Sequence, residues 1–96
     1  MFTRQAGVLE IDVSAVRSGE ALHALLSRAF EFPDYYGANW DAFNDCISSV
    51  PPPDVIRISG LESMRFRLPR DTKLFIECLR YFVEHRAVHP VSLHVG

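Results

Sequence analysis

Residues 32–46 read FPDYYGANWDAFNDC, and this stretch separates two predicted helices and begins the second. Pro33 stops the helix before it, because proline disfavours the helical conformation in the residue that precedes it. Gly37 suits a turn with a positive φ, which glycine adopts at no steric cost. Asn39 suits the N-cap position, since its side-chain oxygen can accept a hydrogen bond from the first turn. The stretch therefore predicts a helix over residues 40–49.

Hydrophobic patterns on both sides of this stretch predict five further elements. Apolar and polar residues alternate near the start and at the end of the chain, which is typical of strands with one buried face. Ser18 suits the N-cap of an earlier helix, and Pro69 suits the first turn of a later one. The connection through Met64 and Phe66 is predicted to be a loop. The predicted elements are strands at residues 8–13, 55–58 and 91–95 and helices at residues 19–30, 40–49 and 69–86.

This order of elements predicts a single α/β domain over residues 1–96, with a small three-stranded, mostly parallel sheet. Right-handed crossovers would place the helices mainly on one face of that sheet. The alternation within the strands agrees, because strands that are covered on both faces show continuous apolar runs.

The composition favours a globular protein of the cytoplasm. Apolar residues make up 48% of the chain and charged residues 23%, which excludes a disordered chain. No apolar run approaches the roughly 18 residues that a membrane span needs, and the amino terminus lacks the pattern of a signal peptide. Cys46 and Cys78 fall in apolar helical patterns, and we interpret them as small buried side chains in a reducing compartment.

The net charge is −2, but the charges are unevenly distributed. Residues 29–56 contain five acidic side chains and no basic one, whereas residues 57–86 contain seven basic and four acidic side chains. Such an asymmetry favours a partner whose surface carries the opposite charge. The five acidic residues are Glu31, Asp34, Asp41, Asp45 and Asp54.

Four polar side chains of the helix predicted over residues 40–49 fall on one face, opposite an apolar arc. At about 100° per residue, Asp45 lies roughly 40° from Asp41, and Ser48 and Asn44 follow within about 20° and 60°. Two like charges four residues apart destabilise a helix by roughly 0.2–0.5 kcal/mol, and no nearby base neutralises them. This polar strip (Asp41, Asn44, Asp45 and Ser48) is therefore predicted to bind a cationic surface from outside the chain.

The residues from Pro33 to Cys46 resemble the signature segment of the barstar family. The shared pattern is a proline, an acid, Tyr-Tyr-Gly, an asparagine, and two aspartates separated by three residues; here it reads PDYYGANWDAFNDC. The rest of the chain is similar in the order and length of its elements. The resemblance implies a barstar-like fold and a proteinaceous inhibitor whose second helix and preceding loop plug the active site of a bacterial ribonuclease.

Carried over by position, the resemblance also implies contact residues. Asp45 would lie where the substrate phosphate otherwise binds, and Asp41 would support the same site. The family also uses a glutamate late in the third helix; counting back from the last strand gives Val83 at this position, and a shift of one residue gives Glu84. The partner-binding candidates are Tyr35, Asn39, Asp41, Asn44, Asp45, Ser48 and Glu84.

The sequence departs from the family where large aromatic contacts are usual, because Asn44 and Val50 stand at those positions. Without these two aromatic contacts, a related ribonuclease toxin, such as one delivered between competing bacteria, fits the implied partner at least as well as a barnase-type ribonuclease. Electrostatics supports this class of partner, since a ribonuclease must be basic where it holds RNA phosphates and a rigid pair of carboxylates can mimic that charge.

One alternative stays open, namely an acidic interaction module of the same fold whose basic partner is not a ribonuclease. A paired-carboxylate hydrolase is disfavoured, because it needs two carboxyl groups in different environments around a cleft, whereas Asp41 and Asp45 are predicted to lie on one exposed helix face. A metal site needs more ligands than two aspartates on one helix, and the four histidines lack the spacing of a zinc site. The basic run from Arg65 to Lys73, with Phe66 in it, carries no nucleic-acid-binding motif. We thus expect a non-catalytic inhibitor that uses no cofactor or metal and binds no nucleic acid, membrane or small-molecule substrate directly.

Overall fold

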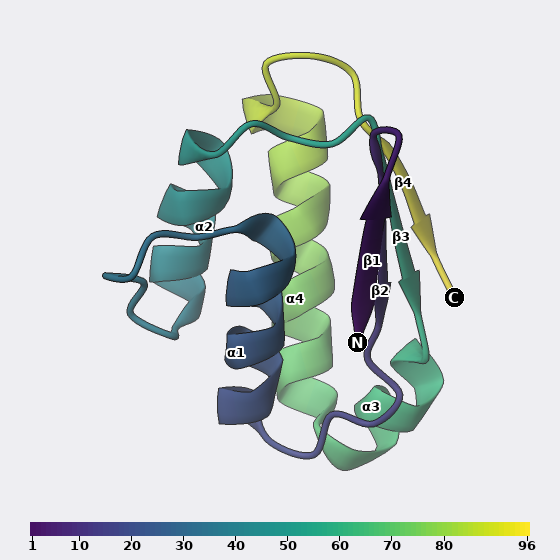
Figure 1. The fold of residues 1–96 in the computed structure, drawn as a ribbon. Helices are drawn as coiled ribbons and strands as arrows, with labels where there is room; N and C mark the ends of the chain where they lie inside the picture. The colour runs from purple at the N-terminus through teal and green to yellow at the C-terminus, as the bar shows by residue number, and fades with distance from the viewer.

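The computed structural model describes residues 1–96, and Figure 1 shows a sheet with helices gathered along one of its faces. The elements in chain order are β1 (Phe2–Gln5), β2 (Val8–Asp12), α1 (Gly19–Phe30), α2 (Trp40–Ser49), β3 (Val55–Ser59), α3 (Leu61–Arg67), α4 (Pro69–Tyr81), the π-helical turn η1 (Phe82–Arg86) and β4 (Ser92–Val95). The predicted α/β class and mostly parallel sheet are confirmed, but the sheet has four strands rather than three.

The sheet has the strand order β1-β2-β3-β4, with β1 antiparallel to β2 and the other two pairings parallel. The sequence analysis missed β1, because its four residues FTRQ contain a single half-buried apolar side chain, Phe2. The strand forms because Ala6 and Gly7, with φ of 52° and 81°, make a two-residue hairpin loop. Positive φ at both central residues matches the turn whose twist suits a hairpin.

The hydrophobic core lies between the sheet and the helices. In register across the sheet, Leu9 of β2 pairs with Ile56 of β3 and Ile56 with Leu93 of β4, and the first two are fully buried. Figure 1 shows α4 beside the sheet and α2 farther from it. Accordingly, α2 packs against α4 and η1 and makes few contacts with the strands. No helix combines the length and the apolar character needed to cross a bilayer.

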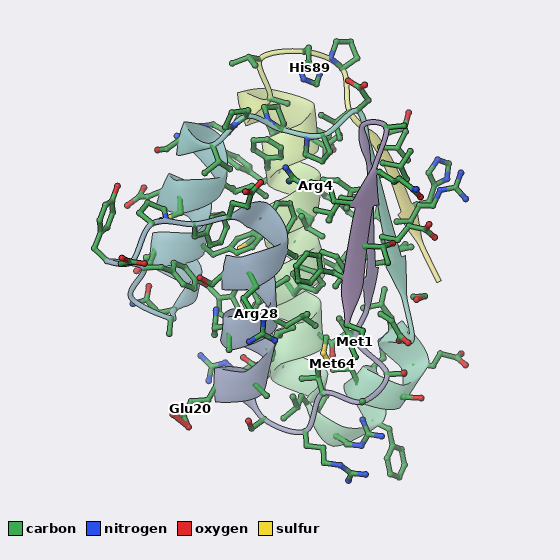
Figure 2. All side chains as sticks on the ribbon, viewed as in Figure 1. Met1, Arg4, Glu20, Arg28, Met64 and His89 are labelled. Carbon is green, nitrogen blue, oxygen red and sulfur yellow. The ribbon has the colours of Figure 1, made fainter.

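Two local features between β3 and β4 differ from the sequence predictions. The segment predicted as a loop forms α3, because Gly60 turns the chain at φ 79° and Leu61 and Met64 then reach the core. Figure 2 shows Met64 pointing from α3 toward the region between α4 and the sheet. The helix predicted to run to residue 86 changes at Phe82 into η1, where the backbone N–H of Ala87 donates to the Phe82 carbonyl at 2.9 Å.

The ends of α1 show one confirmed prediction and one that the structure refines. Ser18 caps α1 as predicted, since its hydroxyl oxygen accepts from the Ala21 backbone N–H at 3.1 Å. The helix ends at Phe30, three residues before Pro33, and its C-cap residue Glu31 adopts a left-handed conformation with φ 57°. The prediction of a positive φ at Gly37 is wrong, because the next residue, Ala38, takes that conformation with φ 52°.

Candidate functional site

The start of α2 is fixed by the cap that the sequence predicted. The Asn39 side-chain oxygen accepts from the Ala42 backbone N–H at 2.8 Å, and its amide nitrogen donates to the Gly37 carbonyl at 3.3 Å. Both polar atoms of this side chain are therefore used inside the chain, which makes Asn39 a positioning residue for the helix. Asp41 lies in the first turn, where a carboxylate is favoured by the helix dipole.

Aromatic side chains hold the buried face of α2. The ring of Trp40 lies 5.4 Å from Phe43 and 6.0 Å from Phe75, between ring centroids, and both phenylalanines are fully buried. Phe43 also packs edge-on against Phe30 of α1 at 6.0 Å and against Phe32 at 5.7 Å. Such pairs add about 0.5–1.5 kcal/mol each beyond the burial of area. The helix is therefore held on a rigid base that joins α1, α2 and α4.

A second, polar group of side chains joins the same three helices and the loop before α2. The Trp40 indole N–H donates to an Asp71 carboxylate oxygen at 3.2 Å. His23 of α1 lies 4.5 Å from the Trp40 ring, and its Nδ1 shares a hydrogen bond with the Tyr36 hydroxyl. Burial lowers the pKa of His23, against the opposing effect of the Asp71 carboxylate. We call these four residues the Trp40 network.

The Trp40 network leaves little space for a side chain at position 19, which is a glycine. A Cβ at Gly19, the first residue of α1, would lie only 3.0 Å from a carboxylate oxygen of Asp71. The absence of a side chain there lets Asp71 of α4 reach between α1 and α2.

The two aspartates of the polar strip face solvent and have no partner in the chain. Asp41 and Asp45 are both exposed, and neither carboxylate makes a hydrogen bond or an ion pair. The chain has one ion pair, in which Arg4 Nη1 lies 3.0 Å from a carboxylate oxygen of Glu31. Figure 2 shows Arg4 extending from β1 toward the helices. The Arg4 guanidinium is thus paired with Glu31 and does not neutralise Asp41 or Asp45 of the polar strip.

The other two members of the strip are less accessible than the sequence suggested. Asn44 and Ser48 are half-buried, and the Ser48 hydroxyl donates to the Asn44 carbonyl at 3.0 Å. Asn44 is on α2, which packs against α4, and its side chain acts to lower the pKa of the Cys78 thiol of α4. The structure therefore brings all four residues to one face of α2, with the aspartates forming its exposed part.

Residues from α4 and η1 border the strip, and the sequence analysis did not include them in the site. Burial raises the pKa of the Cys78 thiol; the Asn44 side chain opposes this rise, and the carboxylates of Glu77 and Asp41 add to it. Glu77, which precedes Cys78 on α4, is thus a further exposed carboxylate that acts on this thiol together with Asp41. The helical phase of the predicted helix over residues 69–86 places Glu77 next to the apolar stripe, but the sequence could not show that this helix packs against α2.

A base also borders α2, at its C-terminal end. Arg86 of η1 lines a hollow of about 270 Å³ together with Ser48, Val50 and the exposed Val88. This position of Arg86 was not predicted, because Arg86 lies far along the chain from the acidic segment. The acidic character of the face is therefore strongest at Asp41 and weakens toward the end of α2.

The remaining candidates lie at the edges of this face. Tyr35 belongs to the loop before α2, and 81% of its surface is exposed. Glu84 is exposed on η1, which packs against α2, and it makes no hydrogen bond or ion pair with the strip.

No three His, Cys, Asp or Glu side chains lie close enough together to hold a metal ion. Cys46 is buried, and burial raises the pKa of its thiol, with a smaller contribution from the Asp45 carboxylate. A thiol with a raised pKa is a poor nucleophile.

Comparison with known protein families places this site in context. A family model described as Barstar (barnase inhibitor) matches residues 6–96. The chain belongs to the barstar family. Members of the barstar family are inhibitors rather than enzymes. No curated protein matches the chain.

Proposed function

We propose that this protein inhibits a ribonuclease by placing α2 and the loop before it in the basic active site of the enzyme. The observation that carries the proposal is the pair of exposed carboxylates, Asp41 and Asp45, which have no partner in the chain. Membership of the barstar family supports the same function.

The proposed mechanism is mimicry of RNA phosphates. A ribonuclease holds its substrate with basic side chains, and carboxylates on α2 can accept charge-assisted hydrogen bonds from them, which are stronger than neutral ones. The rigid base beneath α2 keeps the two carboxylates at a fixed spacing, so little ordering is required on binding. Opposite fields also raise the rate of association. Tyr35 would add an exposed aromatic contact at the edge.

We further propose that the protein acts in the bacterial cytoplasm, as the immunity protein against a ribonuclease toxin that is exported or delivered into competing cells. Two free thiols, Cys46 and Cys78, suit a reducing compartment. In this role the protein acts by occupying the enzyme and performs no reaction itself.

The direct test is to titrate the protein into barnase and related toxin ribonucleases while following cleavage of a fluorogenic RNA. Asp45→Asn should weaken inhibition by about 100-fold or more, because removing one member of a desolvated charge pair costs roughly 3–5 kcal/mol. Asp54→Asn is the matched control, since Asp54 is an exposed acid of the same acidic segment outside α2 and should not matter.

Two results would count against the proposal. Equal inhibition by Asp45→Asn and the wild type would show that the polar strip is not the contact surface. Failure to inhibit any ribonuclease of these groups would favour the alternative, an acidic interaction module with another basic partner.

A further inference from the structure

A basic hollow lies on the side of α4 that faces away from α2. It has a volume of about 450 Å³ and lies between α3 and α4, which are adjacent in Figure 1. At about 100° per residue, Lys73, Ile76 and Arg80 lie roughly 140–200° around α4 from Cys78, the residue that faces α2. We call this hollow the α3–α4 groove; its lining is Arg65, Pro69, Thr72, Lys73, Ile76, Glu77 and Arg80.

The three bases of the groove have no partner in the chain. Arg65, Lys73 and Arg80 are exposed and make neither an ion pair nor a hydrogen bond. Lys73 and Arg80 are seven residues apart on one helix, so their backbones are separated by about 10 Å along the axis. Arg65 faces them from α3. The spacing suits a chain of negative charges better than a single small anion.

An exposed aromatic side chain, Phe66, follows Arg65 on α3 and lies outside the lining of the groove. Phe66 is 91% exposed, although its neighbours Leu61 and Met64 place the opposite face of α3 in the core. Arg65 and Arg67 flank it in sequence, and Arg67 is committed to the carbonyl oxygens of Ser14 and Val16. Phe66 is therefore a large, exposed apolar ring on the same helix as Arg65, available to a flat ligand.

We propose that the α3–α4 groove and Phe66 bind single-stranded nucleic acid, with the bases holding phosphates and the ring stacking on a nucleobase. Unpaired cations in a groove next to an exposed aromatic ring are the combination that binds single strands without sequence preference. A concave lining suits a strand better than a flat membrane surface. Apart from Glu77, which lies between the two surfaces, the lining of the groove lies across α4 from the polar strip. The inference departs from the sequence-based expectation of no direct nucleic-acid binding, and it does not depend on the proposed function.

The groove contains one feature that opposes binding, and it supplies a sharp test. Glu77 is the single carboxylate of the lining, and its charge repels phosphate. Glu77→Gln should therefore tighten binding, whereas a merely structural role for this exposed residue would leave the affinity unchanged.

The experiment measures the fluorescence anisotropy of a labelled oligouridine and a labelled oligothymidine as the full chain is added at low salt. Both should bind, and Phe66→Ala should weaken binding by about 5- to 100-fold, the range that loss of one stacked base produces. The logarithm of the binding constant should fall with the logarithm of salt with a slope of about −2, because roughly three phosphates are neutralised. Arg57→Ala is the matched control, since Arg57 is an exposed base on β3 outside the groove, and it should bind like the wild type.

Any of four outcomes would overturn the inference. They are no anisotropy change at millimolar protein, unchanged binding by Phe66→Ala, no gain from Glu77→Gln, and binding of a duplex as tight as that of its single strand. Binding to vesicles of phosphatidylglycerol without binding to either oligonucleotide would assign the surface to a membrane instead. Because Phe66 is almost fully exposed, Phe66→Ala should fold, and thermal unfolding of each variant checks this.

Discussion

Lowering the pH from about 8 to about 5 should destabilise the protein through His23. This side chain is 5% exposed, and burial lowers its pKa below the ordinary 6.5, although the Asp71 carboxylate acts in the opposite direction. The unfolded chain therefore takes up a proton near pH 6.5, while the folded chain takes it up only at lower pH. The free energy of unfolding consequently decreases as the pH falls below 6.5 and levels off below the folded-state pKa.

The size of the effect has a ceiling. One proton that only the unfolded state binds changes the free energy of unfolding by at most about 1.4 kcal/mol per pH unit. Urea unfolding at a series of pH values measures it, and Trp40 is a suitable fluorescent reporter because it is the one tryptophan and its ring lies 4.5 Å from that of His23.

Variants separate His23 from the other titrating groups. His23→Gln removes the titration and should flatten the profile between about pH 7 and pH 5, whatever its effect on absolute stability. His94→Gln, at an exposed position of β4, should keep the slope of the wild type. Hydrogen bonds from Ser14 lower the pKa of Asp12, so its contribution is lost only in acid near and below 3.8, outside this window. A flat wild-type profile, or the same slope in His23→Gln, would refute the reasoning.

Substitutions at four further positions test the fold and the site by urea unfolding in the absence of a partner. Gly60→Ala should lower the free energy of unfolding by about 2–5 kcal/mol, because φ at Gly60 is 79° and the new Cβ would lie 2.6 Å from the Ser14 backbone nitrogen. Gly7→Ala should lower it less, since the atom that the new Cβ would meet at 2.6 Å is at the end of the flexible Asp54 side chain. Asn39→Ala should cost about 1 kcal/mol through loss of the α2 cap, and Asn39→Asp, which can still accept the same hydrogen bond, should be close to neutral. Asp45→Asn should stabilise the free protein by roughly 0.2–0.5 kcal/mol by relieving repulsion from Asp41, and a loss of stability would contradict the assignment of an unneutralised pair.

Much of the fold could be predicted because local chemistry and burial agree. The N-caps Ser18 and Asn39 and the apolar stripes behind them gave α1 and α2 with the bounds that the structure shows. The missed elements depend on contacts made elsewhere in the chain. β1 contributes few apolar residues and forms by pairing with β2, and α3 is short and is held by Leu61 and Met64 in the core.

The site could be predicted only in the part that lies on one helix. The helical phase brought Asp41 and Asp45 together, since three intervening residues leave them on one face. It could not show that Asn44 acts on the Cys78 thiol, or that Glu77 and Arg86 border the strip, because α4 and η1 come next to α2 only in the folded chain. Neither could it show the α3–α4 groove, which needs a helix that the sequence analysis predicted as a loop.

The acids of this chain differ in what they do for the fold. Asp71 accepts the Trp40 indole N–H, Asp12 accepts the Ser14 backbone N–H at 2.9 Å, and Glu31 pairs with Arg4. Each of these carboxylates stabilises a contact between distant or neighbouring segments. The carboxylates of Asp41 and Asp45 stabilise no such contact, and their mutual repulsion opposes the helix that carries them. The fold therefore does not need this pair, and its stable presentation above the aromatic base is best explained by a basic partner that neutralises both charges at once.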